Sequence, residues 1–213
     1  MTLRLVDSGW ATEMTEALRA DASELRIICP FIKTGALERL LSHRPKNVQV
    51  ITRFNLADFA DGVSDIAALR RVLEAGGRVR GIKNLHAKLY LFGSSRVIVT
   101  SANLTRAALD RNPEFGIVSQ EPTSIATCRA YFDNLWKRGR TDLSRDQLNA
   151  WDETVMRNRA SARPFSRRLG LGDFGADAGI TEPSPIVLPV IVADARQAFV
   201  KFLGEGDKRV PST

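Results

Sequence analysis

The sequence predicts an α/β protein with a mixed β-sheet flanked by helices on both faces. Short apolar runs at residues 25–31, 48–54 and 78–82 have the length and β-branched content of buried strands. Segments with helical spacing of leucines separate them, and this strand–helix alternation is typical of a sheet with helices on its faces. A hairpin follows in place of another helix, so antiparallel strands are expected beside parallel ones.

The helices of the first half are expected from apolar periodicity and from residues that begin or end a helix. The first covers residues 10–18, behind Ser8, a residue type that caps helices. The second opens at Thr34 and ends before Pro45. The third opens at Ser64, after a polar stretch that we expect to be a loop.

The hairpin joins strands at residues 87–92 and 96–100 through a turn at residues 93–95. A further strand at residues 114–120 and a helix at residues 123–138 with one apolar side complete the predicted fold.

The composition changes at Asp142, and this divides the chain into a domain of residues 1–142 and an extension of residues 143–213. The extension opens with a predicted helix at residues 144–157 and continues into an Arg-, Gly- and Pro-rich segment. Its apolar tail either docks on the core or on a partner chain, or begins a further domain.

The net charge of +7 and the pI of 9.9 favour a polyanionic partner, which is nucleic acid or an anionic membrane surface. No basic segment followed by an apolar one opens the chain, and no apolar run approaches ~20 residues. We therefore expect a cytoplasmic protein without a membrane span. The two cysteines, Cys29 and Cys128, fall in apolar patterns typical of buried, reduced thiols.

The chemistry concentrates in the hairpin. His86 and Lys88 are two residues apart, so in a strand their side chains share a face. The turn brings Ser101 and Asn103 back towards that face. An imidazole, an ammonium and an amide that converge on one spot suit a phosphate. No HExxH, paired CxxC or dense Asp/Glu cluster accompanies them, so we expect neither a metal nor a cofactor.

These residues resemble the signature of the phospholipase D superfamily, which reads H-x-K, four residues, D, six residues, G-S-x-N. His86, Lys88, Ser101 and Asn103 match it without a gap. Two positions depart from it, because Gly93 stands at the aspartate place and Thr100 at the glycine place. Glu114 stands where small single-motif nucleases of the superfamily carry an acidic residue.

The resemblance implies a phospholipase D-like fold and a metal-independent mechanism. It assigns to His86 the attack on phosphorus that gives a phosphohistidine. Lys88, Asn103 and Ser101 would then bind the phosphate oxygens. Glu114 would accept a hydrogen bond from the other imidazole nitrogen.

The mechanism needs two histidines, and the chain holds one H-x-K motif. The other histidine, His43, lies in a helix-end sequence without a lysine two residues on. We therefore expect a homodimer in which two copies of His86 share one active site.

Basic residues outside the motif are candidate substrate ligands. Arg53 ends a predicted strand, where ligands gather in α/β sheets, although a surface salt bridge explains it equally well. Arg163, Arg167 and Arg168 resemble a phosphate-backbone clamp, and a solvated basic linker remains open as the alternative.

The resemblance, the basic charge and the single motif together favour a phosphodiesterase, and we place first an endonuclease that acts on DNA in preference to RNA. Single-motif members of the superfamily are linked to restriction or defence, so the resemblance implies such a role. Two alternatives stay open. One is a catalytically impaired nucleic-acid-binding module, because the motif aspartate is missing. The other is a phospholipid-hydrolysing enzyme of the same superfamily.

Overall fold

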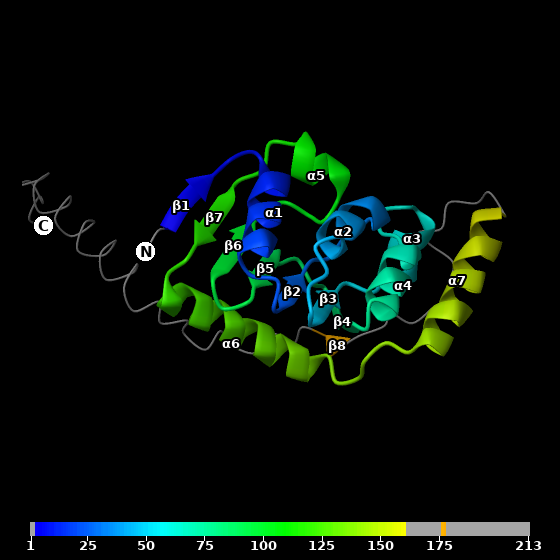
Figure 1. Ribbon diagram of the computed structural model, residues 1–213. Coiled ribbons are helices and arrows are strands. Elements are labelled where there is room, and N and C mark those ends of the chain that lie inside the picture. Colours follow the sequence, from blue (N-terminus) through cyan, green and yellow to red (C-terminus); the bar gives the residue numbers. More distant parts are fainter. Residues whose placement is uncertain (1–2, 161–175, 178–213) are drawn as a thin grey trace, which may run out of the picture. The chain divides into compact units, whose positions relative to one another are not determined.

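The computed structural model describes residues 3–160 and 176–177, and Figure 1 traces them. All of them lie in the first of the two units into which the chain divides, Met1–Gly179. The strands are β1 Leu3–Val6, β2 Leu25–Ile28, β3 Val48–Thr52, β4 Arg78–Lys83, β5 Leu89–Phe92, β6 Arg96–Thr100, β7 Gly116–Ser119 and β8 Ala176–Asp177. The helices are α1 Trp10–Ala20, α2 Thr34–Leu41, α3 Leu56–Ala60, α4 Ile66–Glu74, α5 Arg106–Asp110, α6 Pro122–Arg138 and α7 Arg145–Ala160.

The strands form one mixed sheet in the order β1-β7-β6-β5-β2-β3-β4-β8. The pairs β2–β3, β3–β4 and β4–β8 are parallel, and the remaining pairs are antiparallel. The central strand β2 joins the two halves, because it pairs in parallel with β3 and antiparallel with β5. The predicted mixed sheet is confirmed.

Alternating side chains of the strands feed two apolar cores, one on each face of the sheet. Leu25 and Ile27 of β2 enter the larger core with α1, α2, α4 and α5, whereas Ile28 enters the smaller core. Helix α6 covers the smaller core through Ile125 and Phe132, and Figure 1 shows it on the side of the sheet opposite α1 and α2. Helices on both faces explain why the central strands are apolar on both sides.

Helix α7 packs on the same larger core. Leu148 and Val155 are buried there, as their helical spacing predicts, and the ring of Trp151 lies 4.3 Å from that of Phe54. The sheet and the first helix beyond Asp142 therefore share one core.

Several elements differ from the expectation. Strand β1 was not predicted, and the expected loop before the third helix contains α3, which Asn55 caps by accepting a hydrogen bond from Ala57 N at 2.8 Å. Ser8 does not cap α1, whose N-cap is Gly9. Cys29 is buried and free as expected, and Cys128 is free but only partly buried. The basic cluster and the apolar tail lie outside the described residues.

No helix in the described part of the chain is long and apolar enough to cross a membrane.

Candidate active site

His86 and Lys88 lie in the segment that connects β4 to β5. The strand expected at residues 87–92 begins only at Leu89, so neither residue is in a strand. Leu85 and Leu89 are buried in the smaller core, and this alternation turns His86 and Lys88 to the other side. The Nε2 atom of His86 lies 3.4 Å from Nζ of Lys88. The imidazole is exposed, whereas Lys88 is only 8% exposed. The first half of the predicted site is therefore assembled within one chain.

The environment of Lys88 disfavours its charge. Burial lowers the pKa of the Lys88 ammonium, the positive charge of Arg53 lowers it further, and the negative charge of Glu114 opposes both. Arg53 and Glu114 therefore lie close enough to Lys88 for their charges to act on it.

The loop after β6 presents Ser101 and Asn103 towards the same edge of the sheet. Ala102 and Leu104, which alternate with them, are fully buried. The carbonyl of Ala102 accepts a hydrogen bond from the Tyr90 hydroxyl at 3.0 Å, and the carbonyl of Leu104 accepts one from Lys33 N at 2.9 Å. The loop is therefore fixed from below, and its polar side chains stay on the open side.

Cys29 lies beneath this loop and was identified from the sequence only as a buried thiol. Its Sγ accepts a hydrogen bond from Leu104 N at 3.1 Å and lies 3.7 Å from Oδ1 of Asn103. The amide oxygen of Asn103 faces the thiol, and its NH₂ group takes part in none of the hydrogen bonds described for residues 3–160 and 176–177. Only the fold brings the end of β2 under this loop, so the sequence pattern carries no signal for this contact.

Glu114 pairs with Ser101, whose hydroxyl donates to its carboxylate. Phe115 N donates to the same hydroxyl at 3.0 Å, so the start of β7 holds the serine in place. Among the described residues no hydrogen bond joins Glu114 to His86, the partner expected from the sequence.

Arg53 lies at the same edge but is already engaged. Its guanidinium makes two hydrogen bonds of 2.9 Å to Asp58 and lies 4.6 Å from the ring centre of Phe31. A phosphate would have to share this charge with Asp58. Arg163, Arg167 and Arg168 lie outside the described residues.

The first departure from the signature, Gly93, is explained by Asp21 at the end of α1. Gly93 has φ +51°, and a Cβ atom there would lie 1.8 Å from Oδ2 of Asp21. The same carboxylate accepts a hydrogen bond from Ser94 N at 3.1 Å. Asp21 therefore fills the space of a side chain at position 93 and stabilises the turn. This turn is at the end of β5 away from Lys88.

The second departure, Thr100, is matched by Gly116 on the neighbouring strand. The two residues are opposite each other in the β6–β7 pair, and a Cβ atom on Gly116 would lie 2.6 Å from Cα of Thr100. The hydroxyl of Thr100 accepts a hydrogen bond from Ala102 N at 3.1 Å. The threonine thus helps to hold the loop that carries Ser101 and Asn103.

Within residues 3–160 and 176–177, no three His, Cys, Asp or Glu side chains are grouped so that they could hold a metal ion.

Restoring the motif aspartate should destabilise the protein. We expect Gly93→Asp to lower the free energy of unfolding by about 1–3 kcal/mol, because the new side chain overlaps Asp21. Gly76→Asp is the matched control, since Gly76 also has a positive φ but open space around it, and should cost about 1 kcal/mol. Denaturant unfolding of the Gly93→Asp/Asp21→Ala double variant should show recovery. An equal loss of unfolding free energy in Gly93→Asp and Gly76→Asp would contradict the overlap with Asp21.

The pKa of Lys88 should lie below that of an ordinary lysine and fall further in Glu114→Gln, because the opposing negative charge is removed. A ¹³C NMR titration measures it, and Glu16→Gln on the exposed surface of α1 should leave it unchanged. Since this pKa is lower in the folded than in the unfolded chain, the charged ammonium lowers the free energy of unfolding at pH values below the folded-state pKa. This loss of stability disappears as the pH rises above about 10.4, where the amine is neutral in both states. A rise of the pKa in Glu114→Gln would contradict the charge assignment.

A family model described as "Cardiolipin synthase, PLD-like domain" matches residues 15–136, which is more than half of the 213 residues. None of the curated protein sequences matches the chain significantly.

Two of the similar solved structures, given first here, share the fold. The phospholipase D family member Nuc from Salmonella typhimurium aligns with a TM-score of 0.56 at 19% identity, covering 67% of this chain and 97% of that one. Phosphatidylserine synthase from Haemophilus influenzae Rd KW20 aligns with a TM-score of 0.51 at 14% identity, covering 75% and 45%. NucT from Helicobacter pylori aligns with a TM-score of 0.48 at 13% identity, covering 64% and 96%. The match over residues 15–136, which contain the whole H-x-K…S-x-N motif, shows that the chain belongs to the family of phospholipase D-like domains.

Proposed function

We propose that the protein is a metal-independent phosphodiesterase that cleaves nucleic acid, with DNA preferred to RNA. The observation that carries this proposal is the contact of 3.4 Å between His86 and Lys88 at an open edge of the sheet. Ser101 and Asn103 are held at the same edge by bonds to the core. Members of the phospholipase D-like family act on phosphodiesters, which supports the same reaction here.

The contact also favours one tautomer of His86. An ammonium can only donate, so Nε2 of His86 faces Lys88 with its lone pair and the ring proton is on Nδ1. Nε2 becomes the nucleophile when the Lys88 ammonium turns from this lone pair to an oxygen of the bound phosphate. It forms a bond to phosphorus while the bond from phosphorus to the leaving oxygen breaks, and that oxygen takes a proton from a second imidazole that starts in its protonated form. Water then cleaves the phosphohistidine and returns a proton to the second imidazole.

The second imidazole has to come from another chain. His43 follows α2 at the edge of the sheet where β3 begins, which is opposite the edge that carries His86. The imidazole of His86 is exposed, and the apolar side chain of Phe115, directly after Glu114, is 59% exposed. Both features support a homodimer in which a second copy covers this edge and supplies its own His86.

Two observations bear on the substrate. The net charge of +7 favours a polyanion in general. The matching family model carries the name of cardiolipin synthase, and one solved structure of the same fold is a phosphatidylserine synthase, so phospholipid is the second candidate. Release of head groups from vesicles, without cleavage of nucleic acid, would favour it.

The direct test is cleavage of labelled single-stranded and duplex DNA and RNA in excess EDTA. We expect the wild type to cleave DNA, and His86→Ala to lose at least about 10³-fold in rate because the nucleophile is removed. His43→Ala, the other histidine of the chain, is the matched control and should retain the activity.

Cleavage that disappears in EDTA, or that persists in His86→Ala, would overturn the mechanism. If the wild type binds these polymers without cleaving them, the binding-module reading replaces the nuclease.

A further inference from the structure

A pocket of about 510 Å³ lies between α2 and α5, beside the proposed active site. Its lining includes three cationic side chains and two carboxylates, so it carries one positive charge in excess. The residues are Lys33, Gly35, Ala36, Arg39, Asp65, Arg106, Leu109 and Asp110. None of them belongs to the signature motif.

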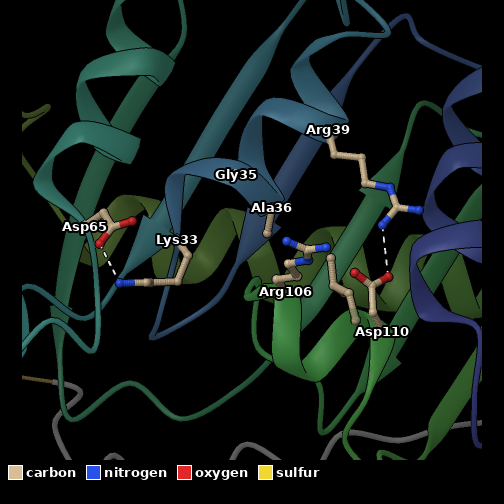
Figure 2. A pocket seen from close by; sticks show the side chains of 8 residues that line it. Lys33, Gly35, Ala36, Arg39, Asp65, Arg106 and Asp110 are labelled. Carbon is tan, nitrogen blue, oxygen red and sulfur yellow. Dashed lines mark hydrogen bonds and ion pairs between the residues drawn. The ribbon is translucent and has the colours of Figure 1, made fainter.

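Both carboxylates of the pocket are engaged. Asp65 accepts from Nζ of Lys33 at 2.6 Å and from Thr34 N at 2.9 Å. Asp110 accepts from Nη1 of Arg39 at 2.9 Å. Figure 2 shows these two pairs at opposite ends of the view, with the guanidinium of Arg106 between them beside Ala36.

Arg106 is the cation that these carboxylates leave uncompensated. It is exposed, and none of the hydrogen bonds or ion pairs described for residues 3–160 and 176–177 involves it. The small side chain of Ala36 and the absent one of Gly35 leave space in front of it, because a Cβ atom on Gly35 would meet nothing within 4 Å. One phosphodiester, with one negative charge, would balance this excess.

The pocket is joined to the active-site loop through the backbone. Lys33 N donates to the carbonyl of Leu104, the residue directly after Asn103. Arg106 follows Asn103 by three positions. Arg106 and Asn103 therefore belong to one short segment of the chain, which links the pocket to the loop that carries Asn103.

We propose that this pocket binds a backbone phosphate of the nucleic acid strand beside the scissile phosphate, with Arg106 as its main ligand and Lys33 and Arg39 as supporting cations. The inference rests on the proposed function, since it names a substrate subsite of the same enzyme. It implies that the substrate is a polymer with phosphates beyond the one that is cleaved.

The test measures binding of a labelled DNA oligonucleotide to the His86→Ala protein over a range of salt concentrations, so that cleavage does not interfere. Adding Arg106→Ala should weaken binding about five- to tenfold and lower the salt slope by about 0.9 for duplex or about 0.7 for single-stranded DNA. Arg106→Lys should keep the slope, because it keeps the charge.

Arg19→Ala is the matched control. Arg19 is also an exposed helical arginine, but it lies at the end of α1, which leads to the opposite edge of the sheet. It should leave both affinity and slope unchanged. All variants should melt at the same temperature, because neither arginine packs in the core.

An unchanged salt slope in Arg106→Ala, or an equal loss of DNA affinity in Arg19→Ala, would overturn the proposal that the pocket binds a backbone phosphate. The proposed function is checked separately by hydrolysis of bis(4-nitrophenyl) phosphate, a diester with one phosphate, by the wild type and by His86→Ala. No difference between these two proteins would overturn the hydrolase while leaving the result for Arg106 to stand by itself.

Discussion

The backbone of Leu104 is the point on which the site depends. Its carbonyl accepts from Lys33 N and its amide donates to Cys29 Sγ, so both backbone groups tie the loop after β6 to the segment between β2 and α2. Buried backbone groups are costly to leave unpaired, so these two hydrogen bonds fix which residue of the loop lies against Cys29 and Lys33. Ser101 and Asn103 are consequently held in place on the loop that follows β6.

The site combines a buried cation with an exposed base. Lys88 is almost fully buried, and the negative charge of Glu114 offsets only part of the cost of its charge. His86 is exposed at the same place, which leaves room for a substrate and for a second chain. A bound phosphate would reduce the cost of the buried Lys88 charge, and a partner subunit would cover the exposed imidazole of His86. Binding of substrate and assembly of the dimer are thus expected to support each other.

Much of the fold could be predicted because its strands and long helices carry local patterns. Strand β1 was missed, since it is a short edge strand whose Leu5 is 67% exposed and whose pairing with β7 spans most of the domain. Helix α3 was missed because five residues with polar neighbours do not form a periodic pattern. Local sequence says little about either kind of element.

The candidate site shows the same division. The motif predicted that the side chains of His86 and Lys88 point the same way, and they lie in contact, although β5 begins only after them. It did not predict Asp21 beside Gly93, Cys29 beneath Asn103 or the pairing of Glu114 with Ser101. These contacts join residues from different elements, so spacing along the chain carries no signal for them.

The most direct test of the account is the activity of a mixed dimer, in which one chain carries His86→Ala and the other is wild type. Two different affinity tags on co-expressed chains allow its purification. If two copies of His86 share one site, the mixed dimer lacks either the nucleophile or the acid, and its cleavage rate should be at least about 10²-fold below that of the wild type. A mixed dimer with about half of the wild-type activity, or an active monomer in light scattering, would contradict the shared site.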